Sequence, residues 1–205
     1  ATVNAVPSFA GLAVVHAEEQ NSQTSTVINE GTLWKYLDNN TDPAEGQASL
    51  TAWTEKGFDD TIWKTASGKF GAKRGALTSF DGFTPTILLQ QYIDGTDIPT
   101  YFFRTTFNVS NLEQLTSITR TLFHDDAVAV YINGHPVKSV DMPTNTQSSN
   151  MFYAGVSAGA PKQADLNLSK AEIQNYLTDG DNVLSVELHN DREASSDIYF
   201  EFQNL

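Results

Sequence analysis

The chain has 205 residues, of which 40% are hydrophobic and 11% aromatic, so it can bury the core of one folded domain. Its 25 acidic and 12 basic residues give a formal charge of −13, which repels nucleic-acid backbones and anionic lipid surfaces at long range. There is no Cys, which excludes disulfides, thiolate zinc sites and cysteine nucleophiles. We therefore expect no nucleic-acid partner and no insertion into a membrane.

The first residues resemble the end of a secretory signal. Residues 1–17 are largely apolar, and Val15-His16-Ala17 resembles a cleavage site of small residues. An ordered N-terminal strand is the alternative, and the stretch is shorter than the ~20 apolar residues of a membrane-spanning helix. Residues 18–28 are polar. We predict a tail or partial signal over 1–28, a domain over 29–205, and a secreted or cell-surface protein.

Short runs that alternate between apolar and polar residues follow, bounded by Gly, Pro, Asn and Asp. This period of two is typical of half-buried strands. The clearest cover residues 101–107, 117–123, 127–132, 183–188 and 198–202. For the last two strands we predict one face toward the core and one face toward water.

A tight turn is predicted at Asn133-Gly134, because both residue types accept the positive φ that a two-residue hairpin requires. Val137 and Val140 then lie on the returning strand. The one convincing helix begins at Ser169, where Ser169 and Glu172 form a capping-box pattern, and ends near Gly180. Many short strands and one or two short helices predict an all-β fold, an antiparallel β-sandwich.

Several segments together resemble one family. They are WKYLD at 34–38, FDDTIWK at 58–64, YFFRTTF at 101–107, HDDAVAVYING at 124–134 and NVLSVELHN at 182–190. In this order they resemble the galactose-binding-like jelly-roll modules of secreted bacterial hydrolases, although Ala127 stands where that family often has Gly. The resemblance implies a β-sandwich without catalytic machinery, attached to a metallophosphoesterase or glycoside hydrolase domain.

Two common catalytic motifs are missing from the sequence. It has no HExxH and no P-loop pattern, and its four His residues do not form a helical metal motif. We therefore predict that the module itself is not an enzyme. A small enzyme is the competing interpretation, and it requires a buried His–carboxylate pair in a cleft.

Polar residues that follow the strands could bind sugar hydroxyls if their loops share one end of the sandwich. They are His124, Asp125, Asp126, His189, Asn190, Asp191, Arg192 and Asp197. Turn formation is the alternative role for such residues. Trp53 and Tyr92 lie in loop-like contexts and could stack on sugar rings, whereas Trp34 and Trp63 are expected in the core. For Arg104 we expect a salt bridge to Asp126 or Asp197.

The early loop offers oxygen ligands at alternating positions, a fragment of the spacing that calcium uses. The candidate metal ligands are Asp38, Asn40 and Asp42. The family resemblance adds Glu201, because these folds often hold a structural calcium between an early loop and the last strand. No cofactor is required. The sequence thus predicts a carbohydrate-binding accessory module, and the alternative is a purely structural domain that packs against an adjoining metallophosphoesterase domain.

Overall fold

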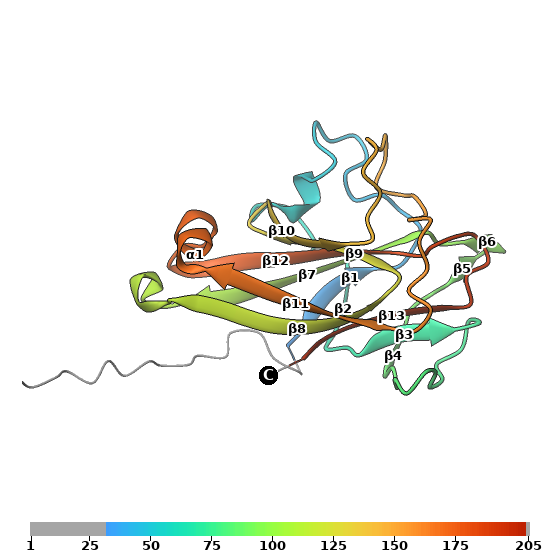
Figure 1. Cartoon of the computed structure of the whole chain (residues 1–205). Coiled ribbons are helices and arrows are strands. Elements are labelled where there is room, and N and C mark those ends of the chain that lie inside the picture. Colours follow the sequence, from blue (N-terminus) through green and yellow to red (C-terminus); the bar gives the residue numbers. More distant parts are fainter. Residues whose placement is uncertain (1–31, 204–205) are drawn as a thin grey trace, which may run out of the picture.

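The computed structural model describes residues 32–203, which form a β-sandwich (Figure 1). The predicted tail and the domain start at 29 lie outside the described residues. The strands are β1 (Trp34–Leu37), β2 (Lys64–Ala66), β3 (Phe70–Lys73), β4 (Ile87–Leu88), β5 (Tyr92–Ile93), β6 (Thr96–Asp97), β7 (Thr100–Val109), β8 (Ser117–Asp125), β9 (Ala127–Ile132), β10 (His135–Val140), β11 (Lys162–Ser169), β12 (Gly180–His189) and β13 (Asp197–Gln203). The helices are η1 (Ala52–Thr54), η2 (Leu112–Gln114) and α1 (Lys170–Tyr176).

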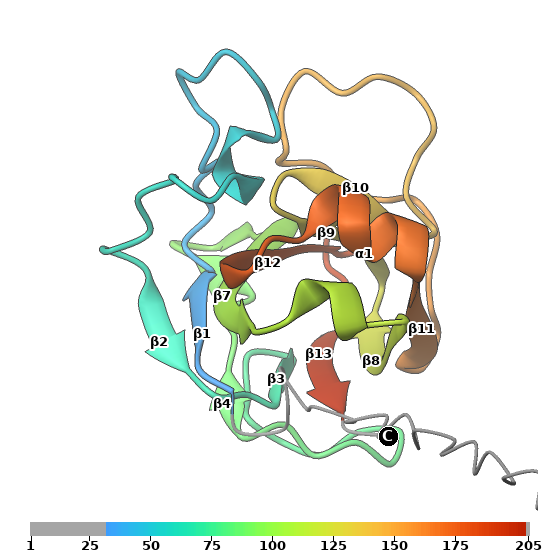
Figure 2. The ribbon, with the colours of Figure 1, turned by 90° about the vertical axis from the view of Figure 1, so that its left-hand side faces the viewer.

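The strands form two packed layers, which Figure 2 shows edge-on. One sheet has the order β10-β9-β12-β7-β1-β2, and the other has the order β11-β8-β13-β3-β4. Pairing is antiparallel except between β3 and β4, and a small β5-β6 hairpin stands apart. The predicted all-β sandwich is confirmed. Of the described helices, none is long and apolar enough to cross a membrane.

Aromatic rings fill the centre between the two sheets. The ring centroids of Phe103 and Phe200 lie 4.5 Å apart, and Trp34 meets Phe200 edge-on at 5.4 Å. Such contacts add to the large apolar area that each ring buries. Trp34 lies in this core as predicted, and Trp63 is also buried, in a second cluster outside the six-stranded sheet.

The outer face of the six-stranded sheet is covered by other parts of the chain. This is contrary to the prediction that the strand at 183–188 has one face toward water. Ser185, Glu187 and His189 point outward from β12, yet each is less than 5% exposed. Two segments lie over this face (Figures 1 and 2), here named the first cover loop, residues 38–63, and the second cover loop, residues 141–161. The outer face of β13 is covered in the same way, by the segment 74–86.

The hairpin and the helix follow their local signals. Asn133 and Gly134 have φ values of 48° and 83°, and Val137 and Val140 lie on β10 as predicted. At the start of α1, the Glu172 N–H donates to Ser169 Oγ and the Ser169 N–H donates to Glu172 Oε1, both at 3.2 Å. The capping box satisfies backbone donors that the first helical turn leaves free.

Replacing Ser169 with Ala is expected to lower the free energy of unfolding by about 1 kcal/mol, because Glu172 N–H loses its acceptor. Chemical denaturation measures this difference. Ser169→Thr keeps the hydroxyl acceptor and serves as the matched control. Equal stability of the Ala variant and the wild type would show that water replaces the Ser169 hydroxyl without lowering the free energy of unfolding.

Candidate functional site

The polar residues predicted at one end of the sandwich do come together. The Asp191 N–H donates to Asp126 Oδ2 and the Ala158 N–H donates to Asp126 Oδ1, both at 2.7 Å. The Asp126 N–H donates to the His189 carbonyl at 3.2 Å. One carboxylate therefore ties the β8–β9 corner to the segment after β12 and to the second cover loop.

Most of these residues are buried, which corrects their predicted role as ligand contacts. The exposed fraction does not exceed 6% for His124, Asp125, Asp126, His189, Asn190 and Asp191. The Asn190 side-chain amide, for example, donates to the Ile98 carbonyl at 3.0 Å. Their polar atoms hold the loops at this end of the sandwich, as the turn-forming alternative expects.

The Asp125–Asp126 pair is electrostatically unusual. Burial, the hydrogen bond to Asp126 and the negative charge of Asp126 raise the pKa of Asp125 to about 9. Asp125 is therefore protonated at neutral pH and donates to Asp126. Burial also lowers the pKa of the adjacent His124, whose Nδ1 lies 2.6 Å from the Asp126 carbonyl oxygen. Because a carbonyl only accepts, Nδ1 carries the proton of this neutral ring.

Two of the predicted ligand residues are exposed at this end. Tyr92 on β5 is 41% exposed, and the Arg192 side chain is 69% exposed. Asp197, at the start of β13, is half-buried and its carboxylate accepts from Ser196 Oγ at 3.1 Å. Tyr92 and Arg192 are thus the predicted residues that remain open to a ligand.

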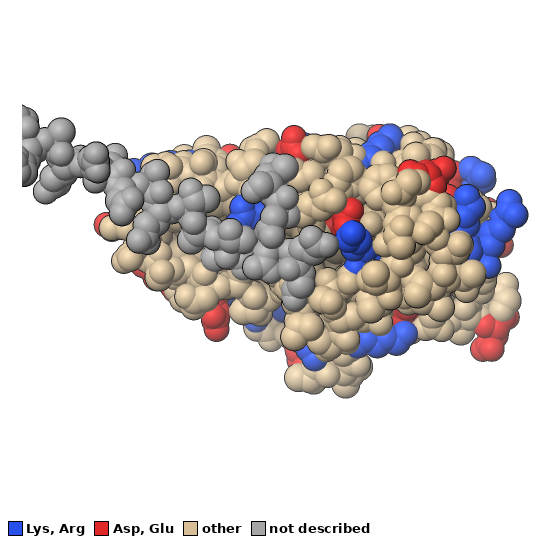
Figure 3. Space-filling model, turned by 90° about the horizontal axis from the view of Figure 1, so that it is seen from below, with Lys and Arg blue, Asp and Glu red and all other residues tan. Residues whose placement is uncertain are grey.

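Tyr92 belongs to a surface built from several loops, here named the end surface: Arg74, Tyr92, Asp97, Tyr153, Arg192 and Glu193. Asp97 is the register partner of Tyr92, and its Oδ2 accepts from the Ala194 N–H at 2.8 Å. Burial and then the negative charges of Asp97 and Glu193 raise the pKa of Tyr153, which places these three groups near one another. In Figure 3, basic and acidic side chains lie side by side at the end of the molecule where Figure 1 shows β5 and β6.

Trp53 does not belong to this end, and its expected role as an exposed stacking ring is wrong. It is 1% exposed, and it packs edge-on against Phe102 at 5.0 Å and Tyr131 at 6.1 Å. These rings stand on the outer face of β7 and β9. Trp53 therefore attaches the first cover loop to the six-stranded sheet.

Arg104 explains why that loop stays in place. Its Nε donates to Asp60 at 2.8 Å, its Nη1 donates to the Trp53 carbonyl, and its Nη2 donates to the Glu55 carbonyl at 3.2 Å. The guanidinium also lies 5.2 Å from the ring centroid of Phe58. The expected partners Asp126 and Asp197 are therefore wrong, because Arg104 points to the outer face and binds the first cover loop.

Three of the four predicted calcium ligands are engaged, each by a different part of the protein. Asp38 accepts from Lys64 Nζ at 2.8 Å, and Asp42 accepts from the Asn150 N–H at 2.9 Å. Burial opposes ionisation of Asp42, but the hydrogen bonds from Asn150, Ala44 and Ser149 together outweigh it and lower the pKa of Asp42. Glu201 lies on β13, 3.9 Å from Lys69 Nζ, and Asn40 is exposed. Over residues 32–203, no three His, Asp or Glu side chains gather in a way that could hold a metal, so calcium binding stays a prediction.

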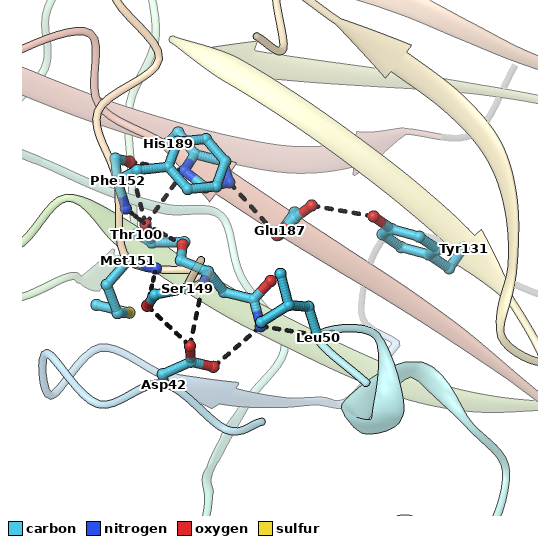
Figure 4. A network of polar contacts seen from close by, with 10 residues as sticks. Asp42, Leu50, Thr100, Tyr131, Ser149, Met151, Phe152, Glu187 and His189 are labelled. Atoms are coloured by element: carbon cyan, nitrogen blue, oxygen red, sulfur yellow. Dashed lines mark hydrogen bonds and ion pairs between the residues drawn. The ribbon is translucent and has the colours of Figure 1, made fainter. Parts of the chain in front are cut away.

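A polar network joins the outer face of β12 to the second cover loop (Figure 4). His189 Nδ1 lies 2.9 Å from the Phe152 carbonyl, and the Phe152 ring stacks on the imidazole at 4.1 Å. His189 Nε2 lies 3.4 Å from Glu187 Oε2, and Glu187 Oε1 accepts from the Tyr131 hydroxyl at 3.0 Å. Burial and then the charge of Glu187 raise the pKa of Tyr131.

This is the buried His–carboxylate pair that the enzyme interpretation requires, but it is sealed. His189 is 0% exposed, and the Thr100 hydroxyl lies 3.1 Å from its Nδ1. The Thr100 hydroxyl also donates to the Asn150 carbonyl, and Asn150 in turn donates to Asp42. The pair thus attaches both cover loops to the sheet, and no substrate reaches it in this structure.

The sequence interpretation missed a groove on the outer face of β9 and β10. Its volume is about 490 Å³, and its lining residues are Ala129, Tyr131, Pro136, Val137, Lys138, Ser139 and Met142. A β-bulge between Pro136 and Lys138 shifts the register of β10 at this place. The only sequence signal was the Pro in a strand, which favours an edge strand with a bulge.

Comparison with known proteins finds similar solved structures alone, all at low sequence identity. No family model and no curated protein match the chain. Similar solved structures include a β-glucuronidase of glycoside hydrolase family 2 (16% identity, TM-score 0.42, 82% of this chain and 14% of that one). Another is a β-glycosidase from Bacteroides vulgatus (14% identity, TM-score 0.44, 87% of this chain and 20% of that one). A third is a β-glucuronidase from Bacteroides uniformis (17% identity, TM-score 0.45, 85% of this chain and 17% of that one). The chain spans at most a fifth of these glycoside hydrolases, and the expected link to metallophosphoesterases finds no support.

Proposed function

We propose that this chain is a non-catalytic module of a larger, secreted carbohydrate-active hydrolase, and that it binds a glycan on the end surface. The observation that carries the proposal is the Tyr92 ring, which stays 41% exposed in a chain whose other large aromatic side chains are buried or half-buried over the described residues. An exposed ring offers an apolar plane for the CH face of a sugar.

The surroundings of Tyr92 support this role. A Cβ added to Gly75 would lie 3.4 Å from Tyr92 Cε2, so the ring rests against the chain at Gly75. The Gly75 N–H donates to the Gln91 side chain at 2.7 Å, which fixes that contact. The carboxylate of Asp97, the register partner of Tyr92, supplies an acceptor for hydroxyl groups nearby. A positioned ring with polar groups around it is the usual composition of a shallow sugar site.

A glycan-array screen of the chain, followed by calorimetry on any hit, tests the proposal. We expect saturable binding that Tyr92→Ala weakens about tenfold or more, because the stacking plane is lost, while Tyr92→Phe keeps most of the affinity. Leu88→Ala removes a similarly exposed apolar side chain elsewhere and is the control. Absence of saturable binding by folded protein, or binding that Tyr92→Ala leaves unchanged, would overturn the proposal.

A structural module that packs against an adjoining domain is the second candidate. Leu33 and Ile62 are 65% and 91% exposed, and they lie just before β1 and β2, which pair at the free β2 edge of the six-stranded sheet. Isolated exposed aliphatic side chains are common on monomeric proteins, so this observation is the weaker of the two. A negative glycan screen would favour this candidate.

A further inference from the structure

We propose that the end surface binds glycans that carry free amino groups, and that the ammonium group of an amino sugar contacts Asp97 beside the rings of Tyr92 and Tyr153. The inference rests on the proposed function, because it names the class of glycan for that same site. It goes further by giving a role to the charge of Asp97, about which an exposed ring alone says nothing.

Tyr92 and Asp97 lie on the same side of the β5-β6 hairpin. They are register partners in an antiparallel pair, and side chains at such positions point to one face with Cβ atoms about 5 Å apart. Asp97 Oδ2 accepts from the Ala194 N–H at 2.8 Å, which holds the carboxylate in place. The Tyr92 ring in turn rests against Gly75. The hairpin therefore presents a ring and a carboxylate side by side before any ligand binds.

The second cover loop brings a second ring, Tyr153, to this place. The two backbone N–H groups that follow Tyr153 donate to the carbonyl groups of Asn190 and Asp191, at 2.9 and 2.8 Å. The loop thus runs beside the segment that continues to Glu193 and the contact with Asp97. Burial and then the negative charges of Asp97 and Glu193 raise the pKa of Tyr153, so its hydroxyl lies within electrostatic range of both carboxylates. Two tyrosines and two carboxylates therefore share one surface.

Neither carboxylate has a cationic partner in the part of the chain that the structure describes. Over residues 32–203, no Lys, Arg or His nitrogen lies within 4 Å of Asp97 or Glu193. Arg192 does not fill this role, because its Nη1 donates to Asp191 at 2.5 Å. Arg74, the other cation of the end surface, is exposed and makes no ion pair with either group. The half-buried carboxylate of Asp97 is thus open to a cation from outside.

The cation that suits this surface is an ammonium group on a sugar. The face of a tyrosine ring attracts a cation within about 6 Å, and a carboxylate adds a charge-assisted hydrogen bond. The CH face of the same pyranose packs on the exposed ring of Tyr92, so one ligand uses both features. The formal charge of −13 also attracts a polymer of such cations at long range. The ligand class is therefore a glycan rich in unacetylated amino sugars.

Calorimetric titration of the chain with three trisaccharides of one backbone tests this assignment. They are the glucosamine trimer of chitosan, its fully N-acetylated form and cellotriose, at a pH at which the amines are protonated. We expect the glucosamine trimer to bind at least about tenfold more tightly than either neutral trimer, since it alone forms the charge-assisted bond. Tri-lysine, a cation without a pyranose to pack on Tyr92, should also bind at least about tenfold more weakly.

Three variants identify the groups involved. Asp97→Asn should lower the affinity for the glucosamine trimer about tenfold, because the charge is lost while the amide oxygen still accepts from the Ala194 N–H. Arg74→Met should raise this affinity, because it removes a cation that repels the ammonium group. Glu113→Gln removes an exposed carboxylate on η2, so it is the matched control for net charge and should leave the affinity unchanged.

The outcomes separate this inference from the proposed function. Equal binding of cellotriose and the glucosamine trimer, lost in Tyr92→Ala but unaltered in Asp97→Asn, would uphold the glycan site and overturn the choice of an amino sugar. Equal binding of tri-lysine would overturn it as well, because charge alone would then suffice. If no trisaccharide binds to the folded chain, the amino-sugar assignment fails, and the glycan screen with Tyr92→Ala still decides the proposed function.

Discussion

Replacing Arg104 with Met should lower the free energy of unfolding by about 3–5 kcal/mol, the range found when one partner of a buried charged network is removed. Arg104 is 3% exposed and donates to the carbonyl groups of Trp53 and Glu55, and over the described residues it is the only donor to the Trp53 carbonyl. Without it the Trp53 oxygen is left unpaired under the first cover loop, the Glu55 carbonyl keeps only the Phe58 N–H, and Asp60 loses its counter-charge. Urea unfolding followed by tryptophan fluorescence measures the difference, because Trp53 and Trp63 pack in the cluster that this loop covers.

Two further variants identify the cause. Arg104→Lys keeps the charge but lacks the planar fork that reaches several acceptors, so its stability should lie between those of the wild type and the Met variant. Lys56→Met removes an exposed cation of the same loop and should change stability by no more than about 0.5 kcal/mol. If Arg104→Met resembled Lys56→Met, the first cover loop would not depend on the guanidinium.

Asp125→Asn should make the protein more stable than the wild type at pH 9 while leaving the two nearly equal near pH 4. The pKa of the Asp125 carboxyl is raised from 3.8 to about 9 in the folded state, so between these values the folded chain holds a proton that the unfolded chain releases. Stability then falls as pH rises through that window, by up to roughly 1.4 kcal/mol per pH unit. An Asn amide donates to Asp126 at every pH and has no such dependence. We expect the variant to be more stable by at least about 2 kcal/mol at pH 9.

Denaturation curves at pH 4, 6, 8 and 9 for both proteins measure this effect. Glu113→Gln, which changes an exposed carboxylate on η2, should retain the wild-type slope and so controls for a general loss of negative charge. Parallel curves for the wild type and Asp125→Asn would mean that Asp125 is ionised beside Asp126 and that the pair shares no proton.

Features that depend on neighbouring residues were predictable from the sequence. The Asn133-Gly134 turn requires two positive φ values, and the start of α1 requires a side chain acceptor at Ser169, so a few consecutive residues determine each. The strand positions were also predictable, because β7, β8, β9, β12 and β13 each contain the expected segment. Alternation in sequence reports which side chains share a face, and it does so without knowledge of the partner strand.

Whether a polar strand face is exposed to solvent could not be predicted in the same way. Glu187 and His189 look like surface residues within β12, but their partners Tyr131, Thr100 and Phe152 lie 37 to 89 positions away. Whether a polar face meets water or a covering loop depends on those distant segments. The same reason explains the errors for Trp53 and Arg104, whose contacts form only when the first cover loop lies on the sheet.

The site was predictable in part. Grouping the residues after β8 and β12 at one end was correct, because β12 runs antiparallel to β9 and its last residue, His189, lies opposite Ala127, where β9 begins after the β8–β9 corner. Their burial was not predictable, since Asp126 satisfies backbone donors of residues 32 and 65 positions away. The groove depends on a bulge in β10 and on the fixed orientation of Tyr131, which no local pattern encodes.

The place of β12 determines when the sandwich can assemble during synthesis. This strand lies between β9 and β7, and it pairs with each along most of its length. A nascent chain that has not yet reached residue 189 therefore presents two long strand edges, on β7 and on β9, with no partner between them. Such edges are templates for pairing with other chains. A ribosome-bound or truncated chain that ends before β12 should accordingly require protection by chaperones, whereas addition of the 10 residues of β12 closes both edges at once.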